Sequence, residues 1–233
     1  QAQKTGAEFA FFLQQVEELA DEQKVFTLSG EDIALLNPNT RTCPIFRSRR
    51  DAELTKAIYR RVPVLIKEGP AEENPWGIKF STMFHMTNDS GLFRTREQLE
   101  GAGYQLTGNV FQNGKEDYLP LYEAKMMHQF DHRFGTYTAE ALASANTSIP
   151  TPTPEQHANS DFVVLPRYWV SEKDVRAAIP GEPKGWLLGF RDITNTTNER
   201  TAIVTIIPEV AVGHQMPLLL SSRNIVESSC LLT

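Results

Sequence analysis

The sequence predicts an α+β fold, in which a helical connector precedes a mixed, mainly antiparallel sheet domain with flanking helices. Three residues of the types that cap helices, Ser48, Thr95 and Ser171, each stand directly before a segment with helical character. Two β-rich runs, Trp186–Ile193 and Thr201–Ile207, flank a short loop rich in Asn and Thr, which is the pattern of a β-hairpin. Capped helices and hairpin strands on one chain together predict the α+β class.

Length, charge and cysteine content bound the possible functions. At 233 residues the chain can form one large domain or two small ones. Its net charge of -6 argues against a generally basic nucleic-acid-binding protein but leaves room for a local basic patch. No apolar run approaches a membrane span, so no membrane partner is expected. The two cysteines, Cys43 and Cys230, lie far apart, which favours a reducing compartment and a cytoplasmic location.

Both ends of the chain indicate a fragment excised from a longer protein. The chain begins with Gln1 rather than Met, and its first residues lack the basic-then-apolar pattern of a signal peptide. It ends in the apolar pair Leu231 and Leu232, followed by Thr233.

The first 61 residues are predicted to form the helical connector. Over residues 8–20, apolar side chains recur at three- and four-residue spacing, which predicts an amphipathic helix. Ser29 predicts the start of a further helix that runs to Leu36, where an Asn-Pro-Asn turn ends it.

The segment 41–61 is the most basic part of the chain. Its cations are Arg41, Arg47, Arg49, Arg50, Lys56, Arg60 and Arg61, against only Asp51 and Glu53. Ser48 predicts the cap of a helix over most of this segment. Clustered arginines are typical of phosphate contact, whereas internal ion pairs would make the same helix an ordinary solvated one. The residues leave both interpretations open.

The stretch Leu119–Tyr137 is the densest in polar and aromatic side chains. Residues 123–134 suit a helix with an apolar face, and Gly135 is placed to end it. Lys125, His128, Gln129 and His132 would then share the other face at helical spacing. Such a face could meet nucleic acid, or it could be solvated, with its histidines in local hydrogen bonds.

Two kinds of metal chemistry are also compatible with this stretch. Histidines at i and i+4 of a helix, as in His128 and His132, can bind one ion together with a carboxylate. The sequence Glu123-x-Lys125 resembles half of a metal-dependent nuclease motif, whose further carboxylate would be Asp117 or Asp89.

The predicted C-terminal hairpin carries a polar tip. Arg191, Asn195, Asn198 and Arg200 lie in or beside the loop between its strands, where they could contact bases or phosphates. Asn and Thr also form turns without any ligand, so turn chemistry alone explains the loop equally well. The preceding polar segment 138–159, with its alternating prolines, is predicted to be a loop.

Four long runs of the sequence resemble one protein family. They are Asn37–Glu53, Met83–Ser90, Leu119–Tyr137 and Phe190–Arg200. Together they resemble the region that follows the catalytic domain in large adenine-specific DNA methyltransferases of restriction–modification (Type II G-like) and related phage-defence systems. The resemblance covers most of the chain from about Val25 onward.

The resemblance implies a TaqI-like target-recognition (specificity) domain. It implies that residues 1–61 connect a catalytic domain, which is not in this chain, to a recognition domain over residues 62–233. Pro217–Ser222 resembles the start of the family's last segment, so the recognition domain is expected to be cut short at its C-terminal end. Neither a glycine-rich S-adenosylmethionine motif nor an Asn-Pro-Pro-aromatic motif occurs in the sequence. No catalytic, cofactor-binding or metal-binding residue is therefore expected here, and S-adenosylmethionine would be bound by the parent enzyme's catalytic domain.

Double-stranded DNA is the partner that the resemblance implies. The residues predicted to contact it, by side-chain type and position, are Arg47, Arg49, Arg50, Lys125, His128, Gln129, His132, Arg133, Arg191, Asn195, Asn198 and Arg200. Two alternatives from other classes stay open. One is a metal-dependent nuclease domain that uses Glu123 and Lys125 together with a nearby Asp. The other is a non-catalytic module that docks a protein.

Overall fold

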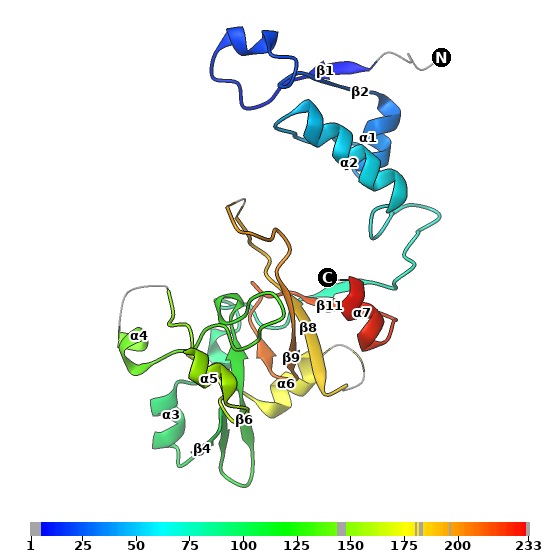
Figure 1. Cartoon of the computed structure of the whole chain (residues 1–233). Coiled ribbons are helices and arrows are strands. Elements are labelled where there is room, and N and C mark those ends of the chain that lie inside the picture. Colours follow the sequence, from blue (N-terminus) through cyan, green and yellow to red (C-terminus); the bar gives the residue numbers. More distant parts are fainter. Residues whose placement is uncertain (1–5, 144–147, 180, 182–183, 196, 232–233) are drawn as a thin grey trace. The chain divides into compact units, whose positions relative to one another are not determined.

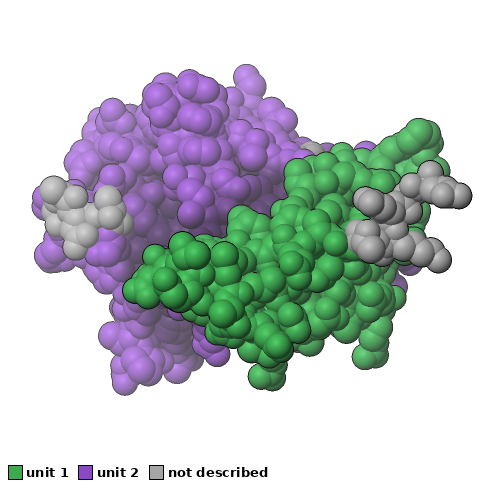
Figure 2. All heavy atoms as spheres, turned by 90° about the horizontal axis from the view of Figure 1, so that it is seen from above, with its two compact units in different colours: residues 1–78 green, residues 79–233 purple. Residues whose placement is uncertain are grey.

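The computed structural model describes residues 6–143, 148–179, 181, 184–195 and 197–231, and the chain divides into two compact units, Gln1–Ile78 and Lys79–Thr233 (Figure 2). The division lies after Ile78, beyond the boundary predicted after Arg61. Helices and three mainly antiparallel sheets occur together, so the α+β prediction is confirmed. Within the described residues, no helix is long and apolar enough to cross a membrane.

Unit 1 is a small two-stranded sheet with helices. Its elements are β1 (Ala7–Phe9), the 3-10 helix η1 (Val16–Ala20), β2 (Phe26–Leu28), α1 (Gly30–Leu36) and α2 (Arg49–Arg61). The predicted helix over residues 8–20 is wrong. Phe9 instead pairs with Phe26 in an antiparallel strand ladder, and their rings stack with centroids 6.2 Å apart. Long-range pairing of aromatic strands has overridden a local helical pattern.

The helix caps predicted in unit 1 are confirmed. Ser29 Oγ accepts from the N–H of Asp32, and Asp32 accepts from the N–H of Ser29, which makes a capping box at the start of α1. Ser48 Oγ accepts from the N–H of Asp51 at the start of α2. Asp32 also lies 3.9 Å from Lys56, whose nearly buried ammonium pairs with Glu53 at 2.7 Å.

Unit 2 is built on two sheets. One has the strand order β10-β6-β5-β4, with β7 also paired to β6, and the other has the order β3-β11-β8-β9. The strands are β3 (Lys79–Ser81), β4 (Gln105–Thr107), β5 (Val110–Gln112), β6 (Asp117–Tyr122), β7 (Trp169–Ser171), β8 (Trp186–Phe190), β9 (Val204–Pro208), β10 (Ala211–Val212) and β11 (Leu218–Leu220). Buried side chains from both sheets form one core, in which Tyr122, Met127 and Met216 are among the largest fully buried members.

Short helices flank these sheets. They are η2 (Ser90–Leu92), α3 (Arg96–Gly101), η3 (Ala124–Met126), α4 (Ala139–Ala143), α5 (Pro154–Ala158), α6 (Glu172–Ala178) and α7 (Ile225–Leu231). Thr95 and Ser171 cap α3 and α6, as predicted. The segment 138–159 was predicted to be a loop throughout, but it contains α4 and α5, the second of which starts with Pro154 after the capping Thr153.

The predicted helix over residues 123–134 is also wrong. Only the 3-10 turn η3 forms, and the chain then makes a tight reversal in which His128 and Asp131 exchange backbone hydrogen bonds of 2.7 and 3.0 Å. Gly135 does not end a helix. It is buried, and a side chain there would meet Ile149 at 2.6 Å, so close packing requires a glycine.

Asp32 makes the stability of unit 1 depend on pH. Burial acts to raise the pKa of Asp32, but hydrogen bonds from Ser29 and the charges of Lys56 and Arg60 outweigh it, so the pKa lies below its usual value. A carboxylate with a depressed folded-state pKa stabilises the fold above its unfolded pKa, and this contribution is lost as pH falls through the folded pKa.

We therefore expect Asp32→Asn to destabilise unit 1 by about 1 kcal/mol at neutral pH. The difference in unfolding free energy between this variant and the wild type should narrow as pH falls below about 4. Hydrogen–deuterium exchange of the α1 amides at neutral and acidic pH measures both effects. Glu31→Gln, an exposed acid in the same turn, is the matched control, and an equal effect there would contradict the role of Asp32.

Candidate nucleic-acid interface

The connection between β8 and β9 is the most prominent surface feature of unit 2. We call residues 191–195 and 197–203 the arm; Figure 1 shows these two segments extending beyond the end of the sheet. The predicted hairpin is confirmed, since Phe190 pairs with Val204 in an antiparallel ladder and Arg191 N–H donates to Ile203 O over 2.9 Å. Beyond this pair the arm exposes Asn195, Asn198 and Arg200.

Ile193 of the arm is an exposed apolar residue. Its side chain is 74% exposed, although it lies just after a buried strand. The arm therefore offers amide, guanidinium and apolar groups to solvent on a two-stranded stem.

A second segment braces the root of the arm. The Phe130 N–H donates to Val204 O over 2.9 Å, and Gln129 Oε1 accepts from the Val204 N–H over 2.9 Å. β9 is an edge strand, and these two bonds occupy the outward backbone groups of its first residue. The reversal at residues 128–131 thus fixes the position of the arm.

Arg191 joins the same brace from the other strand. Its Nε donates to Met127 O over 3.1 Å, its Nη2 also donates to that carbonyl, and its guanidinium lies 5.7 Å from the centroid of the Phe134 ring. Burial lowers the pKa of Arg191 from its usual value. A guanidinium held in this way positions the arm; it is poorly placed to select bases.

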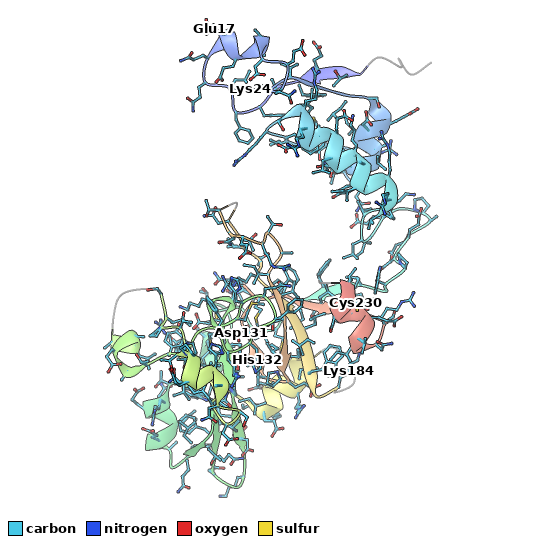
Figure 3. All side chains as sticks on the ribbon, in the orientation of Figure 1. Glu17, Lys24, Asp131, His132, Lys184 and Cys230 are labelled. Carbon is cyan, nitrogen blue, oxygen red and sulfur yellow. The ribbon has the colours of Figure 1, made fainter. Side chains whose placement is uncertain are left out.

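Other predicted contacts of the central stretch also have internal partners. Arg133 donates to the backbone carbonyls of His157, Asn159 and Phe162 over 2.8 to 3.2 Å, which ties the reversal to the segment after α5. The His128 ring packs against Phe134, with centroids 4.7 Å apart. His132 lies beside Asp131 (Figure 3), and burial first, then the charge of Arg133, lowers its pKa.

A polar pocket of about 400 Å³ opens beside the arm. Its lining residues are Glu123, Ala124, Lys125, Arg191, Ile193 and Gln215. Glu123 Oε1 accepts from the Tyr137 hydroxyl over 2.7 Å, and its Oε2 lies 3.3 Å from Lys125 Nζ. The Asp192 N–H donates to Gln215 O over 3.1 Å, so Gln215, which lines the pocket, is bonded to the arm.

Tyr137 and its neighbours hold the charged groups of this pocket in place. The Tyr137 ring lies between two cations, 5.1 Å from Lys125 Nζ and 5.1 Å from Arg167 Cζ. Burial first, and then the bond to Glu123, raises the pKa of Tyr137, so its hydroxyl keeps the proton that it donates. The pocket therefore presents a carboxylate, an ammonium and an amide in defined positions. Gln215 was missed by the sequence reasoning, because only the fold brings it beside the arm.

The metal-dependent alternatives find little support in this geometry. Across the described residues, no group of three or more His, Cys, Asp or Glu side chains could hold a metal ion. Asp117 begins β6, roughly 17–20 Å of strand away from Glu123, and its carboxylate bonds with Gln112. Asp89 accepts from the His85 N–H instead. The predicted i, i+4 pairing of His128 and His132 required a helix that does not form.

The basic segment of unit 1 uses most of its cations internally. Arg49 Nε donates to Val25 O over 3.1 Å, and the Arg47 guanidinium lies 5.9 Å from the centroid of the Phe12 ring. Arg60 lies 3.4 Å from Asp32. These arginines and Lys56 thus bind α2 to the rest of unit 1.

The outward face of α2 carries an apolar row among its charged side chains. Leu54, Ile58 and Val62 follow at four-residue spacing and are 57%, 50% and 65% exposed. Arg50 and Arg61 lie along the edge of this row, at four and three residues from its members. We call Leu54, Ile58 and Val62 the α2 stripe. An exposed apolar row on a helix whose other side already packs on a core is typical of a protein contact.

Comparisons with protein-family models, with curated proteins and with solved structures give no significant match. The interpretation of the site therefore depends on its geometry and on the chemistry of its side chains.

The hydrogen bonds from Arg191 to Met127 O predict what changing Arg191 will do to stability. Arg191→Met should lower the free energy of unfolding of unit 2 by about 2 kcal/mol, because the carbonyl of Met127 loses a charged donor. Arg200→Met, at the exposed part of the arm, should stay within about 0.5 kcal/mol of the wild type. Urea unfolding followed by tryptophan fluorescence measures both. Equal effects of the two substitutions would contradict the brace.

Proposed function

We propose that this chain is the DNA target-recognition region of an S-adenosylmethionine-dependent adenine-N6 DNA methyltransferase of a restriction–modification or phage-defence system. The observation that carries the proposal is the arm: an exposed connection between β8 and β9 with Asn195, Asn198 and Arg200 at its outer part, held at its root by hydrogen bonds of Gln129 and Arg191. The family resemblance of the sequence supports the same assignment.

A projection of this kind suits the major groove. The groove is about 12 Å wide, so the β8–β9 hairpin could carry the arm into it and bring the side chains of the arm to base edges. Asparagine can make paired hydrogen bonds with adenine, and arginine can make them with guanine. Lys125, Gln215 and Glu123 in the adjoining pocket supply a donor, an amide and an acceptor at the side of the arm. Base reading by the arm and the pocket together is what we expect.

Catalysis belongs to another domain in this proposal. The parent enzyme would transfer a methyl group from S-adenosylmethionine to the exocyclic amine of an adenine that is flipped out of the duplex. The residues of this chain would hold and orient the DNA.

The α2 stripe supports a second role for unit 1. Its three apolar side chains, edged by Arg50 and Arg61, would pack against the catalytic domain of the parent enzyme. In this proposal unit 1 docks a protein domain, and unit 2 reads DNA.

Fluorescence anisotropy with a random-sequence duplex tests DNA binding by the chain. Affinity should fall steeply as salt rises, because phosphate contacts release counterions, and Mg²⁺ should have no effect. Cleavage that appears with Mg²⁺ and disappears in Glu123→Gln would favour the nuclease alternative. Absence of binding at low salt would contradict the proposal for the isolated chain and favour a docking module.

Substitutions in the arm should change which sequence is preferred. Arg200→Ala and Asn198→Ala should each weaken binding of the preferred site by about 5- to 100-fold, as loss of a paired base contact does. Selection of bound duplexes from a random pool, before and after substitution, measures the preference. Thr107→Ala, on an exposed strand remote from the arm in sequence, is the control. Unaltered selection in both arm variants would contradict base reading by the arm.

Neutralising Arg50 and Arg60 one at a time tests whether an arginine of α2 contacts DNA phosphates or only pairs within the protein. Arg50→Gln should weaken binding of all sequences alike and reduce the slope of log affinity against log salt by about one. Arg60→Gln, whose charge already pairs with Asp32, should leave the slope unchanged. Equal slopes for Arg50→Gln and the wild type would show that α2 does not touch DNA.

A further inference from the structure

Phe130 occupies a backbone position that favours glycine. It is the second of the two central residues in the reversal that His128 and Asp131 close, and its φ is 57°. Turns with positive φ at this position usually have glycine or asparagine there, because a side chain is disfavoured in the left-handed region. Among the described residues of unit 2, every other residue with positive φ is a glycine.

The side chain of Phe130 gains little burial in return for this conformation. It is 54% exposed, although buried Met126 and Met127 lie only a few residues before it in the chain. Its backbone is also fixed, since its N–H donates to Val204 O and the neighbouring Gln129 accepts from Val204 N–H. An aromatic ring is thus held outward, at the root of the arm, by a reversal that glycine would form with less strain.

We propose that Phe130 is a stacking contact for a DNA base, and that it binds the face of a base at a step that opens when the arm engages the duplex. The proposal rests on the proposed function of the arm. Aromatic side chains bind base faces with little dependence on sequence, because every base has a π-face.

The position of Phe130 supports this assignment. Its backbone is bonded to Val204, the residue that opens β9, so the ring lies where the arm leaves the sheet. The pocket with Lys125 and Gln215 adjoins the same root and is lined by Arg191 and Ile193 of the arm.

Four variants of the whole chain test the proposal. Phe130→Leu keeps an apolar side chain but removes the aromatic face, Phe130→Gly suits the positive φ and removes the ring, and Phe130→Tyr keeps the face. Phe80→Leu is the matched control, because Phe80 is an aromatic residue of unit 2 with 56% exposure on β3. Thermal unfolding of each variant verifies that the fold is intact. Anisotropy is measured with random-sequence duplexes and with the same duplexes carrying one mismatch, which makes a step easier to open.

The binding expected of each variant differs according to whether Phe130 stacks on a base or has only a structural role. The wild type, Phe130→Tyr and Phe80→Leu should bind the mismatched duplexes more tightly than the matched ones. Phe130→Leu and Phe130→Gly should lose that preference and bind about 5- to 100-fold more weakly, the range for loss of one base–aromatic stack. Their salt dependence should equal that of the wild type, because no phosphate contact is lost.

Two outcomes would overturn the inference in distinguishable ways. If the wild type binds duplex DNA and folded Phe130→Leu and Phe130→Gly keep its affinity and mismatch preference, Phe130 does not stack on a base, and the proposed function stands. If the wild type binds no DNA, the proposed function of the isolated chain fails, and the assignment of Phe130 fails with it.

Discussion

The pairing of Val204 with Gln129 and Phe130 is the contact on which the arrangement of unit 2 depends. It joins the edge strand β9 to a reversal that lies some 75 residues earlier in the chain, using one backbone and one side-chain hydrogen bond. Arg191 completes it from the neighbouring strand by donating to Met127 O. Without these bonds, the first residue of the edge strand β9 would leave its outward backbone groups open, and the root of the arm would lose its link to the reversal. The conformation that Phe130 adopts there costs on the order of 1–3 kcal/mol, which the surrounding bonds must offset.

Local sequence signals predicted the features that depend on neighbouring residues alone, which are the helix caps and the β8–β9 hairpin. Ser29, Ser48, Thr95 and Ser171 cap the helices that follow them, because a cap needs only the side chain and the backbone three residues on. The hairpin β8–β9 was predicted for the same reason. The helices predicted over residues 8–20 and 123–134 failed, since in both the helical spacing competes with partners far away in the chain. Phe9 pairs with Phe26, and the Gln129 amide meets the backbone of Val204.

The difference between local signals and distant partners also explains which site residues were predicted correctly. Side-chain type singled out Arg133, Arg191 and Gln129 as DNA contacts, yet the fold uses all three for carbonyl or amide partners that no local pattern reveals. Asn195, Asn198 and Arg200 lie exposed where the predicted loop put them, because a hairpin tip is determined by its own strands. Gln215 reaches the pocket only through the sheet, so no sequence signal pointed to it. For Phe130 a signal did exist, since a Phe in a tight reversal is unusual, but it was hidden by the assumption of a helix.

The disposition of charge bears on how such a chain would select DNA. The net charge is -6, and Arg47, Arg49, Lys56, Arg60, Arg133, Arg176 and Arg191 are all engaged inside the protein. These seven are a minority of the 23 lysines and arginines, and non-specific affinity would depend mainly on the others. A surface of this kind gains most of its discrimination from groups fixed at one place, such as the arm and its pocket. Under the proposed function, the apolar α2 stripe would contact the catalytic domain of the parent enzyme, and the arm would supply the choice of sequence.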